Sequence, residues 1–205
     1  MTPTYQSWDG KYWFIENTDY ASQILKKFKY HFNDFDDKIA RGVTNTHKGD
    51  QVYFKHNEAL DVEEFLIKYV NKLFKDAEMP YVLEDNPFQI EAMDRPALMH
   101  ARWKIRYESG GWQGAHQHQT GADEPGFTMI SVVMYFSNPG LEVHDGSLYT
   151  IFPEKDGMVK NQVLNPSAGK VVVMSGNLFH GTYPTTTQRD IIVMDFVAKK
   201  VSNES

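Results

Sequence analysis

The sequence NPSAGKVVVMSGNLFH, residues 165–180, combines a turn, a strand and a histidine. Pro166 and Gly169 are typical of a tight turn. The apolar run 170–174 that follows is short and rich in valine, which favours a buried strand. Gly176 lets the chain bend again after this strand. The segment therefore predicts a β-sheet protein in which His180 stands at the exit of a strand.

The chain after residue 96 contains four more short apolar runs that resemble residues 170–174. They are rich in Val, Ile, Tyr and Phe and are separated by Gly, Pro, Asn and Asp, a pattern typical of a β-sandwich or β-barrel. The expected strands are residues 99–107, 127–136, 147–152 and 191–197.

The first hundred residues carry helical patterns instead. Apolar residues recur at helical spacing over residues 61–74, which predicts an amphipathic helix. Asp61 is expected to cap its start, with Glu64 in the capping-box position.

A weaker helical pattern begins near Thr18 or Asp19 and continues to about residue 32. The polar stretch 33–55 is expected to be a loop with one short strand near Val52. We therefore predict one α+β domain over residues 1–205, with a mainly helical flank at 1–98 and a β core at 99–198.

Length, charge and cysteine content limit the functional classes. A chain of 205 residues fits one compact domain. Acidic side chains outnumber basic ones by 27 to 21, which argues against nucleic acid as the main partner. The absence of cysteine excludes disulfides, zinc–thiolate sites, iron–sulfur clusters and thiol nucleophiles. Any metal site must use His, Asp or Glu.

The N-terminal sequence MTPTYQSW has no basic segment followed by an apolar run, so no secretory signal is expected. No apolar stretch reaches 18 residues either, so no membrane span is expected. These observations predict a cytoplasmic protein.

Two histidines lie close together in the sequence GAHQHQ, residues 114–119. Residues two apart in an extended segment project to the same side, so His116 and His118 can converge on one metal ion. Two surface histidines in a glycine-rich loop would have the same spacing, so the pair alone does not establish a metal site. His31, His47, His56 and His100 have no ligand-like spacing.

Over residues 99–198 the order of features resembles the iron(II)- and 2-oxoglutarate-dependent oxygenases, in particular the prolyl-hydroxylase-like branch and related phage and bacterial enzymes. The features are Trp103 on a strand, the pair His116-x-His118, the strand end MYF (134–136), the turn DGSL (145–148), the turn PSAG (166–169), His180 and Arg189.

The resemblance implies a double-stranded β-helix, or jelly-roll, core with flanking N-terminal helices. It also implies that His116 and His180 bind Fe(II), that Arg189 binds the remote carboxylate of 2-oxoglutarate, and that Tyr135 adds a hydroxyl group at that anchor. The implied activity is a dioxygenase that uses 2-oxoglutarate and molecular oxygen. Its substrate would be a peptide or protein side chain, with proline as the first candidate, or a small molecule.

His118 departs from the family pattern, in which the second ligand is a carboxylate. Three alternatives follow for the metal site. His118 completes a three-histidine catalytic site, or Asp145 folds in as the carboxylate, or only two protein ligands bind the iron. His144-Asp145-Gly146 also reads as an ordinary hairpin turn.

Two other functional classes remain open. A cupin-like metalloenzyme or binding protein also uses a His-x-His pair and a later histidine, although Glu124 lies slightly too far along the chain for the cupin glutamate and Arg189 would have no role. A noncatalytic interaction domain would retain the β scaffold alone. The stretches 119–126 and 153–167 are expected to be loops over the substrate.

Overall fold

The computed structural model describes residues 4–7, 10–33, 35, 46–55, 58–83, 102–118, 126–154 and 156–201. The helical elements are α1 (Ala21–Phe28), the short 3₁₀ helix η1 (Lys29–Phe32) and α2 (Leu60–Asp76). The strands are β1 (Thr4–Ser7), β2 (Tyr12–Asn17), β3 (Thr46–Tyr53), β4 (Tyr81–Val82), β5 (Arg102–His116), β6 (Phe127–Tyr135), β7 (Leu148–Pro153), β8 (Val159–Leu164), β9 (Val171–Ser175), β10 (Phe179–Thr182) and β11 (Arg189–Lys200).

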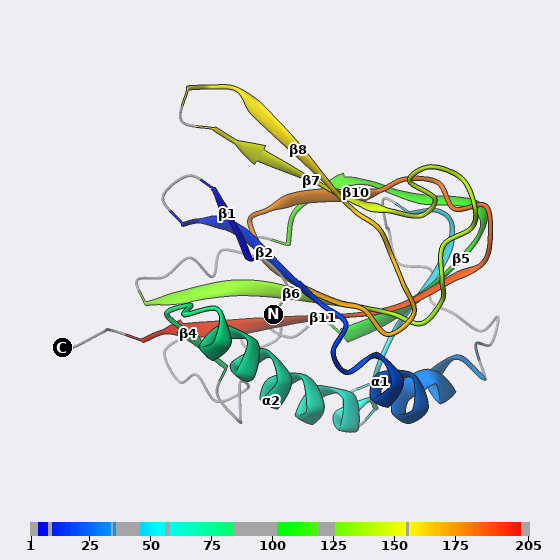
Figure 1. Ribbon diagram of the computed structural model, residues 1–205. Coiled ribbons are helices and arrows are strands. Elements are labelled where there is room, and N and C mark those ends of the chain that lie inside the picture. Colours follow the sequence, from blue (N-terminus) through cyan, green and yellow to red (C-terminus); the bar gives the residue numbers. More distant parts are fainter. Residues whose placement is uncertain are drawn as a thin grey trace.

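The strands form one curled sheet. Its order is β1-β2-β9-β6-β11-β5-β10-β7-β8, with β3 added to β5 and β4 added to β11. The curl brings β7, β8 and β10 over the face of β6 and β11, and helices α1 and α2 lie beneath the opposite face of these two strands (Figure 1). The sheet therefore has an inner face, enclosed by its own curl, and an outer face covered by helices.

Residues of β11 alternate between two hydrophobic cores. Ile192 and Met194 pack in the outer core, which contains the apolar faces of α1 and α2. Ile191 and Val193 pack in the inner core, which lies inside the curl. A strand covered on both faces needs no polar face, and this explains the continuous apolar sequence that predicted β9 and β11.

Helix α2 spans the predicted residues, but its start differs from the expectation. Ala59 is the N-cap, with a left-handed φ of 57°, and no side chain caps the helix. Asp61 instead accepts a hydrogen bond from the Tyr30 hydroxyl at 3.0 Å. Glu64 pairs with Lys68 one turn later, at 2.7 Å. The predicted capping box was wrong because both carboxylates have partners outside the cap.

A buried ion pair joins α2 to the sheet. Glu63 accepts a hydrogen bond from the Arg102 guanidinium, and both side chains are buried. Glu63 is a charged residue of an amphipathic helix, yet Arg102 at the start of β5 covers its side chain. A buried carboxylate is tolerated there because a cation compensates its charge.

The N-terminal flank contributes strands as well as helices. Helix α1 and η1 occupy the stretch in which the weaker helix was expected. Strand β2 pairs with β9, and β3 pairs with β5, so both belong to the same sheet as the core. Strand β3 is longer than the short strand expected near Val52 because its polar sequence is held in place by backbone hydrogen bonds to β5 rather than by an apolar pattern.

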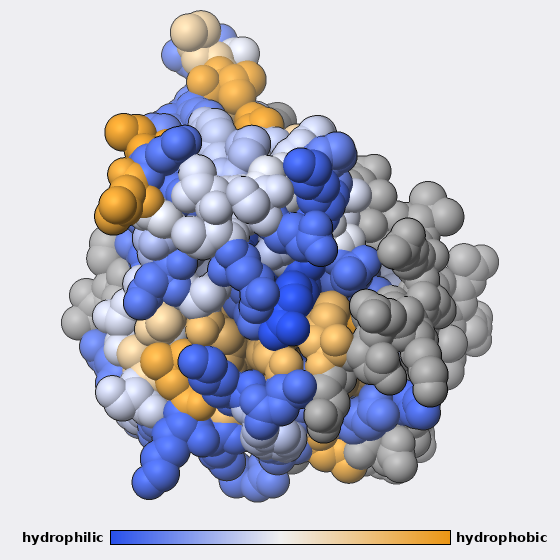
Figure 2. Space-filling view, turned by 90° about the vertical axis from the view of Figure 1, so that its right-hand side faces the viewer, coloured by the Kyte–Doolittle hydropathy of each residue, from blue (hydrophilic) through white to orange (hydrophobic). Residues whose placement is uncertain are grey.

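A strand overlaps each of the five stretches expected after residue 96, although residues 99–101 of the first lie outside the described residues, and β8 lies within a stretch expected to be loop. Strands β7 and β8 form a hairpin that projects from the body of the molecule (Figure 1). Met158 and Val159 are exposed at its end, and apolar atoms are visible at the projecting end in Figure 2. Among the described residues, no helix is long and apolar enough to cross a membrane.

Candidate metal centre

Two of the predicted ligands face each other across neighbouring strands. His116 ends β5, His180 lies on β10, and the two are paired directly in the antiparallel register. Side chains opposite each other in such a pair project from the same face with their Cβ atoms about 5 Å apart. The register therefore turns both imidazoles into the inner space of the curled sheet.

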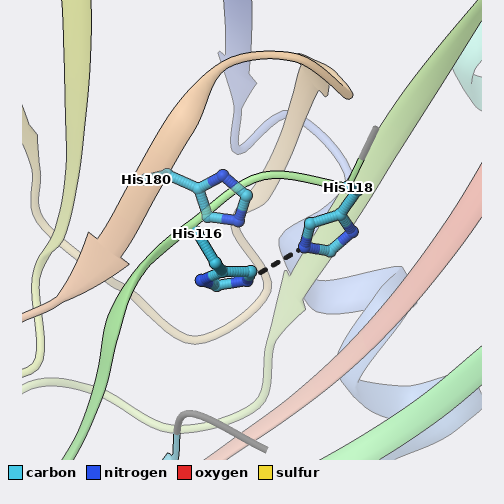
Figure 3. A group of neighbouring side chains, drawn as sticks. All are labelled: His116, His118 and His180. Carbon is cyan, nitrogen blue, oxygen red and sulfur yellow. Dashed lines mark hydrogen bonds between the residues drawn. The ribbon is translucent and has the colours of Figure 1, made fainter. Parts of the chain in front are cut away.

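His118 joins them from just beyond the end of β5. Its backbone N–H donates a hydrogen bond to the Gly176 carbonyl at 2.8 Å, which holds the chain beside the exit of β9. One ring nitrogen of each of the three histidines lies within 4.8 Å of the others. Figure 3 shows the three imidazoles turned toward one another.

Hydrogen bonds select the ring nitrogen that each histidine presents to the others. Nδ1 of His116 lies 2.9 Å from the Gly114 carbonyl, and Nδ1 of His180 lies 2.9 Å from the Leu178 carbonyl. Nδ1 of His118 lies 2.8 Å from the Asp195 carboxylate. Carbonyl and carboxylate oxygens only accept hydrogen bonds, so in each case Nδ1 carries the proton. Each neutral imidazole then offers the lone pair of Nε2.

This donor set fits a metal ion. Nε2 of His116 lies 3.0 Å from Nε2 of His118, the contact dashed in Figure 3. With a proton on both Nδ1 atoms, this contact needs a further proton or a metal ion between the two Nε2 atoms. Two nitrogen ligands at about 2.1 Å from a metal and at about 90° would be separated by about 3.0 Å. Three imidazoles on one side of a metal also leave positions open for other ligands.

The electrostatics of the site favour the neutral form of His180 and His116. Burial lowers the pKa of His180 well below its usual value, and repulsion from His118 and His116 lowers it further. Burial likewise lowers the pKa of His116, against a hydrogen bond to the Gly114 carbonyl that raises it. A neutral imidazole is the form that binds a metal.

Asp195 and Trp103 surround His118, and sequence reasoning did not identify Asp195. Both carboxylate oxygens of Asp195 lie within 2.9 Å of His118 Nδ1. Trp103 stacks on the same imidazole, with ring centroids 5.6 Å apart. The sequence does contain a signal for it, because Asp195 is a charged residue within the otherwise apolar stretch 191–198.

Arg189 lies in the same pocket as the histidines. It is 2% exposed and is paired with Tyr107 of β5, whose ring lies 4.1 Å beneath the guanidinium carbon. Nη2 donates to the Thr182 hydroxyl at 3.0 Å, and Nη1 donates to the Gly146 carbonyl. Strands β10 and β11 and the turn at Gly146 therefore hold the guanidinium in one orientation.

The charge of Arg189 has no acidic partner among the residues that the structure describes. Asp190, the nearest acid in sequence, pairs with Arg106 at 2.8 Å instead. Successive residues of a strand face opposite ways, so Asp190 lies on the outer face and Arg189 on the inner one. Arg189 Nε is also buried without a hydrogen-bond partner in the described part of the chain. A buried cation with an unused donor suits an anionic ligand.

Asp145 does not join the histidines. Its carboxylate accepts hydrogen bonds from the Thr185 hydroxyl and the Thr186 backbone N–H, both at 3.0 Å. Burial opposes ionisation of Asp145, but the hydrogen bonds from Thr186 and Thr185 outweigh it and hold the pKa below its ordinary value. Asp145 therefore fastens the turn that contains Gly146 to the chain before β11, and of the two candidates it is His118 that reaches the other histidines.

One pocket is lined by all three histidines together with Tyr135 and Arg189. Burial raises the pKa of Tyr135 far above its usual value, although Arg189 opposes the shift. The phenol is therefore neutral and can donate a hydrogen bond within the pocket. Its contact with 2-oxoglutarate stays a prediction.

The remaining histidines do not join this group in the part of the chain that the structure describes. His47 packs against Trp112, and His31 lies 3.6 Å from Asp61. His56 and His100 lie outside the described residues, as do Glu124 and most of the stretch 119–126.

No family model and no curated protein matches the sequence. Solved structures do match. A Pseudomonas putida prolyl-4-hydroxylase superposes with a TM-score of 0.58 at 16% identity, over 93% of each chain. A viral collagen prolyl hydroxylase from Paramecium bursaria Chlorella virus-1, in complex with 2-oxoglutarate, gives a TM-score of 0.56 at 15% identity, over 93% of this chain and 98% of that one. A Trichoplax adhaerens prolyl hydroxylase, bound to a peptide fragment of hypoxia inducible factor, gives 0.55 at 13% identity, over 91% and 83%.

The chain has the fold of these prolyl hydroxylases. The double-stranded β-helix expected from the sequence is thereby confirmed, and the likeness extends over more than nine-tenths of the chain. Within a double-stranded β-helix, the three histidines and Arg189 occupy the inside of the curl, where the sheet itself shields them from solvent.

Proposed function

We propose that this protein is an Fe(II)- and 2-oxoglutarate-dependent dioxygenase. One observation carries the proposal: a single pocket contains three converging imidazoles and a buried arginine that has no acidic partner in the described residues. A ligand that chelates a metal ion at the three histidines and carries a second carboxylate to pair with Arg189 would fill both ends of this pocket. 2-Oxoglutarate has this form, with a keto acid at one end and a carboxylate at the other.

Each residue has a separate part in this proposal. His116, His118 and His180 hold Fe(II) through Nε2, since each Nδ1 is committed to an oxygen acceptor. Arg189 binds the remote carboxylate through the guanidinium, which Thr182 and the ring of Tyr107 keep in place.

Bound there, Fe(II) supplies the chemistry in which oxygen and 2-oxoglutarate become carbon dioxide and succinate while a substrate C–H becomes C–OH. The protein orients the groups and excludes water. The side chains of Ile191 and Val193 line the same pocket as Arg189 and form an apolar wall beside the proposed ligand. Because apolar side chains exclude water, they lower the local dielectric constant and strengthen the attraction between Arg189 and a carboxylate.

For the substrate we propose a peptide or protein side chain, with proline as the first candidate. The support is that the Trichoplax adhaerens structure holds a peptide fragment. A small molecule is the alternative, and a prolyl peptide assay under oxygen separates the two by peptide hydroxylation.

An anaerobic titration tests the proposed function. We expect calorimetry to detect one Fe(II) per chain, and then one 2-oxoglutarate per iron-loaded chain with much weaker binding when iron is absent. Succinate formation after oxygen is admitted would establish turnover. A chain that binds iron without any affinity for 2-oxoglutarate would instead support the cupin-like alternative, and a chain that binds neither would support a noncatalytic domain.

Arg189 favours the dioxygenase over the cupin-like alternative. A cupin-like metal site has no use for a buried cation at this position, whereas burial of an unpaired guanidinium destabilises the fold unless a ligand compensates it. The converging Nε2 atoms likewise disfavour a noncatalytic domain, because lone pairs that face one another in a pocket are unfavourable unless a ligand lies between them.

A further inference from the structure

The three imidazoles leave the proposed iron site without a negative charge of its own. The resemblance leads one to expect two histidines and one carboxylate, a ligand set with a charge of −1. Here His116, His118 and His180 are neutral when they bind a metal, so the ligand set carries no charge. A neutral ligand set holds a divalent ion more weakly than one that includes a carboxylate.

A carboxylate nevertheless lies immediately behind one ligand. Asp195 places its two oxygens 2.8 and 2.9 Å from His118 Nδ1, on the side of the ring away from His116. In Figure 3 the second ring nitrogen of His118 points away from the other two histidines. Both side chains are buried, with exposed fractions of 7% for His118 and 8% for Asp195.

The Asp195 carboxylate makes no hydrogen bond or ion pair other than those to His118 within the described residues, and no Lys or Arg among them pairs with it. A carboxylate that is buried here against an imidazole, with no cationic side chain beside it, is poorly solvated. A divalent ion on the far side of the same imidazole would compensate its negative charge.

Strand β11 places two charged residues at opposite ends of one face: Arg189, which lines the pocket, and Asp195, which lies behind His118. Arg189, Ile191, Val193 and Asp195 alternate with outward-facing residues and so share the inner face. Arg189 lies where the remote carboxylate of 2-oxoglutarate would bind, and Asp195 lies beside the proposed metal ligand His118. This polarity matches an iron-bound dianion whose free carboxylate reaches toward Arg189.

We infer that Asp195 supplies, through the imidazole of His118, the negative charge that a directly bound carboxylate supplies in the related oxygenase pattern. Asp195 is thus a positioning residue, since it contacts the ligand and not the metal. It fixes the tautomer that offers Nε2 and raises the basicity of that nitrogen, as carboxylates behind metal-bound histidines do. This inference rests on the proposed function, because it requires that the histidines bind iron.

Asp195→Asn is the first test, since it removes the charge and keeps the shape. Titrated anaerobically with Fe(II) alone, the variant should bind about 10- to 100-fold more weakly than the wild type. The reduction potential of bound iron should also rise, because the variant lacks the negative charge that stabilises Fe(III) relative to Fe(II). Asp190→Asn is the matched control: it is a buried aspartate on the same strand, paired with Arg106 on the outer face, and its iron affinity and potential should be unchanged.

A second variant shows whether Asp195 acts through His118. In a His118→Asp background a carboxylate can bind the metal directly, so adding Asp195→Asn should weaken Fe(II) binding less than threefold. An equal loss in both backgrounds would overturn the inference, because the effect would then not pass through the imidazole.

One measurement needs no variant. In ¹⁵N-labelled wild-type protein without metal, the ring nitrogens of His118 should report a proton on Nδ1 and none on Nε2. The opposite tautomer would overturn the inference even if Asp195→Asn failed to fold. Failure of the proposed function is distinguishable from these outcomes, because the wild type itself would then not bind Fe(II).

Discussion

At the residue scale, Arg189 connects the fold to the proposed cosubstrate. Its guanidinium is buried without an acidic partner among the described residues, so truncation should remove the anion site without unfolding the sheet. Arg189→Ala should lose 2-oxoglutarate affinity by about thirtyfold to several thousandfold, as expected when one member of a buried charge pair is removed. Fe(II) affinity should stay near that of the wild type. Calorimetry on the iron-loaded protein measures both.

Two further variants sharpen this prediction. Arg189→Lys should fall between the wild type and Arg189→Ala, since an ammonium keeps the charge but not the two-pronged geometry. Arg106→Ala removes a guanidinium that faces the outer side and pairs with Asp190, so it should leave 2-oxoglutarate affinity unchanged. Unchanged affinity in a folded Arg189→Ala protein would contradict the anchor role.

The histidines also predict how the stability of the metal-free protein depends on pH. Burial lowers the pKa of His180 and His116 in the folded state, whereas in the unfolded chain both titrate near pH 6.5. The unfolded state therefore binds more protons below that value, and the free energy of unfolding should fall as pH drops from about 7 to 5. Denaturant titrations of metal-free protein at several pH values measure the slope. His180→Phe should reduce the slope of unfolding free energy against pH. An unaltered slope in that variant would be evidence that burial of His180 does not cause the pH dependence.

At the scale of elements, the turn before β7 holds the arginine. Gly146 has a φ of +57°, and a Cβ there would lie 2.9 Å from Arg189 Nη1. Gly146→Ala should therefore both strain the turn, at a cost of about 1 to 3 kcal/mol, and displace the guanidinium. We expect a loss of 2-oxoglutarate affinity of at least about tenfold, which corresponds to about 1.4 kcal/mol.

Gly157 is the matched control for that experiment. It has a φ of +82°, also in a turn between strands, but a Cβ there would meet nothing within 4 Å. Gly157→Ala should cost similar stability and leave 2-oxoglutarate binding unaltered. Equal binding losses in both variants would show that strain, and not contact with Arg189, is responsible.

The same turn separates the roles of the two candidate third ligands. His118 lies with His116 and His180, whereas Asp145 is bound by Thr185 and Thr186. His118→Ala should therefore weaken Fe(II) binding far more than Asp145→Ala, which should mainly loosen the turn and weaken 2-oxoglutarate binding. Anaerobic Fe(II) titration decides between them, and the reverse order would transfer the ligand role to Asp145.

At the scale of the whole molecule, iron binding and folding are coupled. The three ligands come from β5, its extension and β10, so a bound ion joins parts that separate on unfolding. At 100 times its dissociation constant, Fe(II) should add about 2.7 kcal/mol, or about 5 to 10 °C in melting temperature for a chain of this size. Anaerobic calorimetry should show this shift in the wild type and not in His180→Ala. A single transition in both proteins would fit the expectation of one domain.

Much of the fold was predictable because its strongest signals are local. The apolar runs of β6, β9 and β11 and the amphipathic pattern of α2 identify elements that bury large apolar areas. Strands β2 and β8 were not predicted, and β3 was predicted only as a short strand near Val52, since their residues take the extended form only when backbone partners from elsewhere in the chain are present. In these strands, pairing with distant strands outweighs the weak intrinsic β-propensity of the residues.

The kinds of side chain in the site and their order can be predicted from the amino-acid sequence: a His-x-His pair, a later histidine and an arginine nine residues beyond it. These follow from chemistry and spacing. The tertiary structure alone decided the partners. Pairing of His116 with His180 depends on strand register. The choice of His118 over Asp145 depends on the hydrogen bonds that already hold the Asp145 carboxylate. The role of Asp195 depends on a contact across 77 residues of chain. Such contacts arise from folding in three dimensions, for which a single sequence carries no local pattern.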